Sequence, residues 1–232
     1  MPNNHYNKQY FEERDHLDLH IAESIMLFMD EHKLKSLLDI GCGTGRMVKY
    51  FNDLGFKALG CDIYDDALKA ARKINKKNSI VRASAVKLPF KKNAFDMIIS
   101  ISVIEHLTPK EAEKFIKEAE RVLKPGGFIF LVTPNYSTPI RLLQGKKWFG
   151  YLDPTHVNFY TPKRLSTLLK NSGFINTKTR FKTIYGSTFN WEFPPLFSKL
   201  PYIVRPFLVY LFFSSPLSII RNSFWLAAQK YE

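Results

Sequence analysis

Cysteine is scarce in this chain of 232 residues, which contains only Cys42 and Cys61. Each of them lies beside an apolar run, and no spacing of ligand-type residues resembles a zinc site or a disulfide framework. We therefore expect no bound metal, and the reducing cytoplasm is the compartment that this composition favours.

Long apolar runs are also missing. The longest uncharged apolar stretch, residues 206–220, has 15 residues including two prolines. A membrane-spanning helix needs roughly 20 predominantly apolar residues. The first 20 residues are polar and charged and lack the apolar core of a signal peptide. The sequence therefore predicts neither a membrane span nor export.

Acidic residues are few compared with basic ones. The chain has 34 lysines and arginines against 21 aspartates and glutamates, a formal net charge of +13 at pH 7. This charge favours polyanions such as nucleic acid or an anionic membrane, although lysines that only keep the surface soluble explain it equally well. Hydrophobic residues make up 45% of the chain and charged residues 24%, which is typical of a folded domain.

Short apolar runs recur at regular intervals and alternate with segments of helical spacing. This alternation predicts right-handed crossovers and a parallel sheet with helices on both faces, which is a doubly wound α/β fold. The expected strands are residues 36–41, 57–63, 79–85, 95–102, 127–134, 174–184 and 223–230.

Helices are expected before and between these strands. Residues 17–34 have apolar positions at close to helical spacing. A later helix begins with Thr161 as its N-cap and Pro162 at the first helical position, and Gly173 is its expected C-cap. We expect one domain over residues 1–232, composed of an N-terminal helical cap (1–35), a cofactor-binding core (36–185), an aromatic insertion (186–221) and a last strand (222–232).

The stretch LLDIGCGTGRM places three glycines directly after the first expected strand. Gly41, Gly43 and Gly45 allow a sharp turn into a helix and let a ligand approach the backbone closely. The dinucleotide fingerprint requires G-x-G-x-x-G, but Gly45 comes one residue early. The spacing therefore disfavours NAD and favours a ligand whose sugar and amino-acid tail lie across the turn.

An acidic residue ends the second expected strand. Asp62 lies 17 residues beyond Gly45, where a doubly wound fold places an acceptor for the two hydroxyls of a ribose. The alternative is a turn aspartate, because Asp65 and Asp66 follow and could cap the next helix. The glycine loop upstream makes the ribose interpretation the stronger one.

Further motifs follow in order, and together they resemble the class I S-adenosylmethionine-dependent methyltransferases, notably the small-molecule branch that includes ubiquinone-biosynthesis O-methyltransferases. LLDIGCGTG, GCDIYDDAL, LPFKKNAFDMIISISVIEHL and RVLKPGGFIFLVTPN are similar to the first to fifth motifs, and DPTHVNFYTPKRLSTLLKNSGF to the segment before the sixth strand. The resemblance implies a Rossmann-like, mostly parallel seven-stranded sheet with an antiparallel last strand. It also implies S-adenosylmethionine as cofactor and S-adenosylhomocysteine as product.

The resemblance assigns roles to the matching positions. Asp39 and the backbone of the glycine loop would hold the methionine end, Asp62 the ribose and Ile63 the adenine. The family usually has Asp-Ala after the third strand, but this chain has a serine before the alanine, so the adenine contact loses charge assistance. The implied set is Asp39, Gly41, Cys42, Gly43, Asp62, Ile63, Ser84, Ala85, Ser100 and Ile101.

Methyl transfer to oxygen or nitrogen requires the acceptor to lose a proton, and two histidines could accept it. His106 follows Glu105 at the end of the fourth expected strand, and His156 lies in the aromatic loop YLDPTHVNFY. An unperturbed pKa near 6.5 suits either of them at neutral pH, although His106 could instead only hydrogen-bond the neighbouring loop. We predict a methyltransferase that acts on a small or lipid-like molecule at oxygen.

Aromatic side chains crowd the segment between the last two expected strands. Nine of them lie within residues 189–213, too many for a plain surface loop. The segment is either a lid or subunit interface, or a membrane patch. In the second case residues 189–221, which include Lys199, Arg205 and Arg221, would contact an anionic membrane peripherally and take a lipid-like acceptor from it.

Other function classes compete with this prediction. Methyltransferases of base amino groups usually carry an Asn/Asp-Pro-Pro-aromatic turn after the fourth strand, whereas this chain has SISVIEHL there. Nucleic acid is therefore not the expected acceptor. RNA methylation is the alternative enzymatic function, and a cofactor-binding scaffold protein is the non-catalytic alternative.

Overall fold

The computed structural model describes residues 6–13, 15–179 and 221–232, together with positions 181, 201, 203, 204 and 207. Most of the expected aromatic insertion, residues 186–221, lies outside this part, and so does its interpretation as a lid, an interface or a membrane patch.

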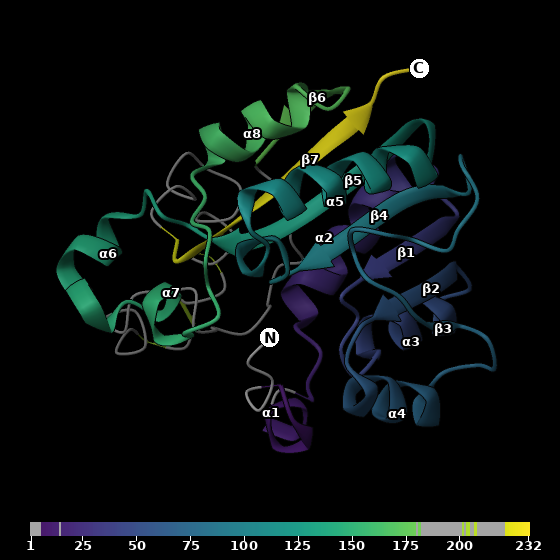
Figure 1. Cartoon of the computed structure of the whole chain (residues 1–232), viewed down its shortest axis with the longest axis horizontal. Helices are drawn as coiled ribbons and strands as arrows, with labels where there is room; N and C mark the ends of the chain where they lie inside the picture. Colours follow the sequence, from purple (N-terminus) through teal and green to yellow (C-terminus); the bar gives the residue numbers. More distant parts are fainter. Residues whose placement is uncertain are drawn as a thin grey trace.

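A seven-stranded sheet forms the centre of the molecule (Figure 1). Its strands are β1 (Ser36–Ile40), β2 (Lys57–Asp62), β3 (Ile80–Arg82), β4 (Phe95–Ile101), β5 (Leu123–Pro134), β6 (Phe174–Lys178) and β7 (Ser223–Lys230). They lie in the order β3-β2-β1-β4-β5-β7-β6. The first five pair in parallel, whereas β7 is antiparallel to both β5 and β6. The predicted doubly wound sheet with an antiparallel last strand is confirmed.

Helices cover both faces of this sheet (Figure 1). On one face α2 (Leu19–Glu31), α3 (Arg46–Asp53) and α4 (Asp65–Ile74) bury apolar side chains against the strands. On the other face α5 (Pro109–Val122) and α8 (Pro162–Lys170) do the same. Because both faces are covered, the central strands are apolar on both sides, as expected for parallel strands. None of the helices in the described ranges is long and apolar enough to cross a membrane.

Shorter elements surround the carboxyl ends of the strands. The N-terminal α1 (Lys8–Glu13) lies within the expected helical cap over 1–35, although no separate helix was predicted there. A 3-10 turn, η1 (Ile104–His106), follows β4. Beyond β5 the chain forms α6 (Pro139–Gln144), a second 3-10 turn, η2 (Gly145–Lys147), and α7 (Phe149–Leu152). In Figure 1 this α6–α7 segment forms the left-hand end of the molecule.

Helix ends confirm one sequence prediction and correct two. The Thr161 hydroxyl oxygen accepts a hydrogen bond from the Arg164 N–H, which is the predicted N-cap of α8. The predicted C-cap at Gly173 is wrong: α8 ends at Lys170 with Asn171 as its C-cap. Gly173, at φ +90°, instead turns the chain into β6.

The second correction concerns α4. Tyr64, not an aspartate, is its N-cap, and no side chain bonds the helix end. Asp65 and Asp66 lie in the first turn, where negative charge interacts favourably with the helix dipole. Asp65 and Asp66 therefore do not cap α4 through their side chains, whereas Oδ1 of Asp62 accepts a hydrogen bond from the Tyr64 N–H at 3.0 Å, as a turn aspartate does.

The order of the strands locates the crevice where ligands bind in such sheets. From β1 the chain moves outward to β2 and β3, and then returns to form β4 on the other side of β1. The connections after β1 and β4 therefore run in opposite directions. Open α/β sheets bind ligands at this switch point, beyond the carboxyl ends of the strands.

Candidate functional site

The glycine loop lies at the switch point, between β1 and α3, and close packing requires a glycine at position 41. Gly41 has φ +79°, and a β-carbon there would lie 2.3 Å from Cγ2 of Val103, just after β4. Gly43, at φ +52°, is different because an added β-carbon would meet no atom within 4 Å. The loop is thus pressed against β4 at Gly41 and open to a ligand at Gly43.

Internal hydrogen bonds fasten this loop to the end of β2. The N–H groups of Gly41 and Cys42 both donate to the Cys61 carbonyl, at 2.8 and 3.0 Å. The Gly43 N–H donates to Oδ2 of Asp62 at 2.9 Å. Because these three donors are engaged, the loop would meet a ligand with its carbonyl oxygens and its exposed Cα atoms, which suits an ammonium group better than a phosphate.

Two buried carboxyl groups stand beside the loop. Asp39 on β1 and Asp62 at the end of β2 are 3% and 7% exposed. Burial, and then the charge of Asp62, raise the pKa of Asp39 to about 8. Burial also raises the pKa of Asp62, against hydrogen bonds from the N–H groups of residues 43, 63 and 64. A cationic, hydroxyl-bearing ligand would compensate both carboxylates, so the donor set fits S-adenosylmethionine.

The other residues assigned to the cofactor lie around the same strand ends. Ile63 is 47% exposed, so its side chain can pack on a flat ring. The Ser84 hydroxyl oxygen accepts a hydrogen bond from the Val86 N–H at 3.4 Å, which leaves it capacity for a further bond. Ser100 is buried and its hydroxyl donates to the Ile40 carbonyl at 2.9 Å, tying β4 to β1. Ile101 is half-buried at the end of β4. These assignments stay predictions.

The two candidate bases come together although they are far apart in sequence. His106 ends η1 and His156 lies beyond α7, and their ring centroids are 4.7 Å apart. The N–H groups of Val157 and Asn158 donate to the Glu105 carbonyl at 3.0 and 3.1 Å. This pairing holds the loop that carries His156 against the end of β4.

One hydrogen bond sets the protonation of His156. Its Nδ1 lies 2.7 Å from the Gly150 carbonyl oxygen, which can only accept. The neutral imidazole therefore carries its proton on Nδ1, and Nε2 keeps a lone pair. That is the form of histidine that can act as a general base.

Glu105 is a site residue that sequence reasoning did not select. It is 1% exposed, and burial raises its pKa to about 7. The Thr133 hydroxyl donates to its Oε2 at 3.0 Å, while Oε1 is buried without a hydrogen-bond partner. One ligand-type atom from each of Glu105, His106 and His156 lies within 4.8 Å of the others, a compactness that the spacing in sequence did not indicate.

Tyr6 is the second residue that sequence reasoning missed. Its ring centroid lies 4.6 Å from that of Tyr64, which follows the ribose aspartate. Its hydroxyl lies 2.9 Å from Nδ1 of His106 and 2.6 Å from Oγ1 of Thr155. The segment around α1 therefore covers the crevice from the cofactor side to the histidines. Only the cluster of aromatic residues near the N-terminus hinted at such a contact.

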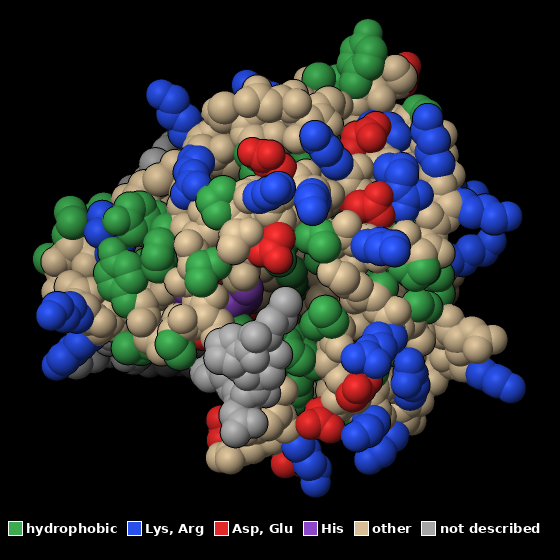
Figure 2. All heavy atoms as spheres, viewed as in Figure 1, with side chains coloured by type: hydrophobic (Ala, Val, Ile, Leu, Met, Phe, Trp, Pro, Cys, Tyr) green, Lys and Arg blue, Asp and Glu red, His purple; other side chains and the backbone are tan. Residues whose placement is uncertain are grey.

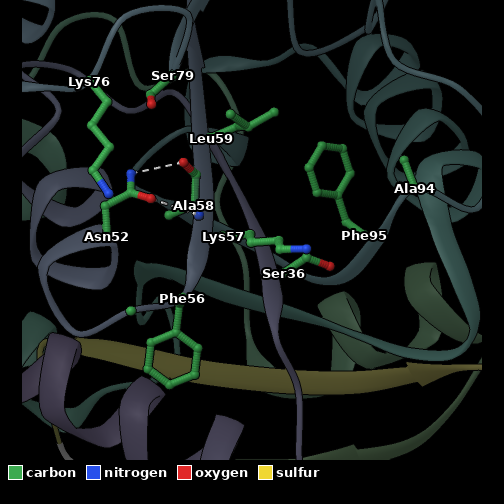
Figure 3. Close-up of a pocket in the computed structure, with 11 residues that line it drawn as sticks. Ser36, Asn52, Phe56, Lys57, Ala58, Leu59, Lys76, Ser79, Ala94 and Phe95 are labelled. Atoms are coloured by element: carbon green, nitrogen blue, oxygen red, sulfur yellow. Dashed lines mark hydrogen bonds between the residues drawn. The ribbon is translucent and has the colours of Figure 1, made fainter.

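A hollow of about 530 Å³ lies at the opposite edge of the sheet (Figure 3). It is lined by residues at the starts of strands, such as Ser36 and Lys57. The Asn52 side chain borders it and exchanges two hydrogen bonds with the backbone of Ala58, at 3.0 and 3.2 Å. None of the predicted site residues lines this hollow.

The fold and the crevice define a nucleoside-binding protein of the Rossmann-like methyltransferase class, and comparison with known proteins agrees. The family model described as "Methyltransferase domain" matches residues 38–131. A solved S-adenosylmethionine-dependent methyltransferase from Archaeoglobus fulgidus has the same fold, with a TM-score of 0.61, 21% identity and coverage of 90% of this chain and 94% of that one.

Relatives with higher identity extend this result. An uncharacterized protein of Methanocaldococcus jannaschii is 36% identical over 63% of this chain and 69% of its own. "Probable tRNA methyltransferase 9B" of Mus musculus is 40% identical over 45% of this chain. "Tocopherol O-methyltransferase, chloroplastic" of Arabidopsis thaliana is 33% identical over 60% of this chain. The matched parts span only 23% and 42% of these last two relatives. The chain therefore contains a methyltransferase domain over residues 38–131 and has the fold of S-adenosylmethionine-dependent methyltransferases.

Proposed function

We propose that this protein transfers a methyl group from S-adenosylmethionine to an oxygen atom of a small or lipid-like acceptor. The observation that carries this proposal is the pair of histidines at the carboxyl end of β4, with ring centroids 4.7 Å apart beside the buried Glu105. A relative named for O-methylation of tocopherol supports a small apolar acceptor.

The cofactor would lie across the glycine loop. Its amino-acid end would meet Asp39 and the backbone of Gly41, Cys42 and Gly43, and its ribose would meet Asp62. When bound, S-adenosylmethionine supplies a methyl group on a positively charged sulfur. Ile63, Ser84 and Ala85 would contact the adenine, and backbone groups of Ser100 and Ile101 would line the methionine portion.

The histidines would remove the acceptor's proton. An unprotonated Nε2 would take the acceptor's hydroxyl proton as the acceptor oxygen receives the methyl group that bound S-adenosylmethionine would supply, so that the products would be the methylated acceptor and S-adenosylhomocysteine. The Nδ1 bond to Gly150 leaves Nε2 of His156 in this form, so His156 is the first candidate base. His106 is close enough to serve as the second.

The α6–α7 segment supports a lipid-like acceptor. Leu142, Leu143 and Leu152 are 73%, 87% and 66% exposed. Lys146 and Lys147 are exposed between them, and no acidic residue occurs from position 139 to 152. Figure 2 shows apolar side chains and cations together at this end of the molecule. A surface of this type suits peripheral contact with anionic lipid from the cytoplasm. Residues 189–221, the region to which sequence analysis assigned such contact, lie mostly outside the described residues.

RNA methylation is the second candidate, and two observations favour it. A relative is named as a tRNA methyltransferase, and the net charge is +13. Many of the cations in Figure 2 lie away from the α6–α7 end and are interspersed with acidic residues. A scaffold protein that binds the cofactor without catalysis is the third candidate.

Radiolabelled S-adenosylmethionine separates these candidates. Three acceptors are offered: a long-chain phenol in anionic vesicles, a water-soluble catechol and total tRNA. Label in either phenol supports the proposal, and label only in tRNA replaces it with RNA methylation. Calorimetry with S-adenosylhomocysteine and NAD runs beside this assay. Binding of S-adenosylhomocysteine without label transfer to any acceptor favours the scaffold protein. Binding of NAD but not of S-adenosylhomocysteine would contradict the assignment of S-adenosylmethionine as the cofactor.

A further inference from the structure

The contact between the N-terminal segment and the histidines is built from four short distances. Tyr6 Oη lies 2.6 Å from Thr155 Oγ1 and 2.9 Å from His106 Nδ1. Thr155 Oγ1 lies 2.9 Å from the same Nδ1 and donates its proton to Oδ1 of Asp153. These residues come from the N-terminal segment, the 3-10 turn after β4 and the loop between α7 and α8.

Counting protons assigns a direction to each bond. Because Thr155 gives its only hydroxyl proton to Asp153, its oxygen can only accept from Tyr6 and His106. The Tyr6 hydroxyl can supply the proton for its own contact with Thr155. The Thr155 hydroxyl proton is already used, so Nδ1 of His106 must be protonated to donate the hydrogen bond between these two atoms.

The surroundings keep the Tyr6 hydroxyl protonated and the Asp153 carboxyl group ionised. Burial raises the pKa of Tyr6, so its hydroxyl stays protonated at neutral pH. Although burial acts against it, hydrogen bonds from the Thr155 side chain and N–H lower the pKa of Asp153, so that carboxylate stays an acceptor.

We propose that Tyr6 and Thr155 are positioning residues that keep a proton on Nδ1 of His106, so that the neutral ring carries its lone pair on Nε2. Free neutral histidine prefers the opposite tautomer, so the network selects the form that can take a proton from an acceptor. The inference rests on the proposed methyl transfer, in which that form is the useful one. It also gives α1 a role, because the segment that covers the crevice delivers Tyr6.

Packing explains why Tyr6 can do this only when the segment is docked. Its ring packs on Tyr64 and lies edge-on to Tyr10 at 4.8 Å. Arg46 at the start of α3 holds Asp15 through two hydrogen bonds of 2.8 and 2.7 Å, which fasten the chain beyond α1. Tyr6 thus links the cofactor side of the crevice at Tyr64 with the histidine side.

Nitrogen NMR of the histidine rings tests the proposal without an acceptor. The full-length protein with ¹⁵N-labelled histidine is compared with its Tyr6→Phe, Thr155→Val and double variants, and His106→Gln assigns the signals. Tyr10→Phe is the matched control, because it removes a hydroxyl from the neighbouring ring. We expect the wild type to show a protonated Nδ1 and a pyridine-type Nε2.

The single variants should shift the His106 signals partway, since each leaves one acceptor, and the double variant should exchange the two nitrogens. A wild-type His106 protonated on Nε2 would overturn the proposal. A Tyr6→Phe spectrum identical to that of Tyr10→Phe would do the same. Circular dichroism identifies any variant that fails to fold. Because Tyr6→Phe keeps the ring packed on Tyr64, the spectrum of this variant decides the test.

S-adenosylhomocysteine binding keeps this test distinct from the proposed function. Tyr6→Phe should change the dissociation constant by less than about threefold, because the ring contact with Tyr64 is retained. A wild type that does not bind S-adenosylhomocysteine would contradict the proposed function and leave the tautomer result standing. A wild type that binds it but shows the other tautomer would contradict only the role of Tyr6 and Thr155.

Discussion

The two halves of the crevice are assembled in different ways. The residues assigned to the cofactor come from successive strand ends between positions 39 and 101, and the motifs there follow one another along the chain. The proposed acceptor half joins Tyr6 to Thr155, which are 149 positions apart. The comparison shows that short sequence motifs predict the residues of the cofactor half. The proposed acceptor half instead depends on contacts between segments that are distant in sequence.

Gly41→Ala should have the largest effect, and it acts on the cofactor half. The added β-carbon would lie 2.3 Å from Val103 at a φ of +79°. The left-handed conformation costs roughly 1–2 kcal/mol and overpacking roughly 1–3 kcal/mol, so affinity for S-adenosylhomocysteine should fall about 100-fold or more in calorimetry. Gly55→Ala is the control, with φ +89° and no neighbour within 4 Å. Equal losses of affinity in both variants would contradict the role of loop packing.

His156→Gln tests the acceptor half alone. Removal of a general base should lower turnover by about 100-fold and leave cofactor affinity intact. Turnover is measured with whichever acceptor takes radiolabel, and affinity is measured by calorimetry. The exposed His16→Gln is the matched control. Unchanged turnover in His156→Gln would eliminate it as the base and leave His106.

Replacing Leu142 and Leu143 with serine tests whether the acceptor half extends to a membrane. Both side chains are more than 70% exposed, and loss of their apolar contact should weaken binding to anionic vesicles about tenfold. Co-sedimentation is the measurement, with Leu54→Ser as a control because Leu54 is 48% exposed on another surface. Equal binding of all three proteins would remove the α6–α7 segment from membrane contact.

Asp39→Asn should separate stability from cofactor binding. The pKa of Asp39 is about 8, raised mainly by burial, whereas an unfolded aspartate titrates near 3.9. The neutral form is therefore favoured on folding. The contribution of protonated Asp39 to the free energy of unfolding is fully present below about pH 4 and is lost as the pH rises through 8.

The asparagine variant should lose this pH dependence. Above pH 8 its free energy of unfolding in urea should exceed that of the wild type by about 1–3 kcal/mol. It should also bind S-adenosylhomocysteine more weakly. Parallel pH curves for the two proteins would contradict the elevated pKa of Asp39. An undiminished affinity would contradict its contact with the cofactor.

Much of the fold could be predicted because local rules and tertiary packing agree. The strand Ser36–Ile40 lies within the expected strand over 36–41, and the helix Pro109–Val122 connects two strands, as the alternation of strands and helices predicts. The expected strand over 79–85 shrinks to Ile80–Arg82, which is an edge strand that pairs only with β2. Edge strands are short because one side has no partner to extend the ladder.

Less of the site could be predicted. His106 and His156 were selected as separate candidates, but nothing in their local sequence places the rings 4.7 Å apart. Glu105 was read only as the neighbour of a histidine, and its burial is a property of the packed strand ends. Tyr6 carried no motif at all.

The sequence by itself determined the doubly wound fold class, the glycine turn and the acidic residue that ends β2, because each depends on neighbouring residues and on the geometry of a single crossover. Only the tertiary structure decided which side chains share the acceptor half of the crevice. Hydrogen bonds such as that between Tyr6 and His106 act over about 3 Å. The chain brings such atoms together only after both faces of the sheet have packed.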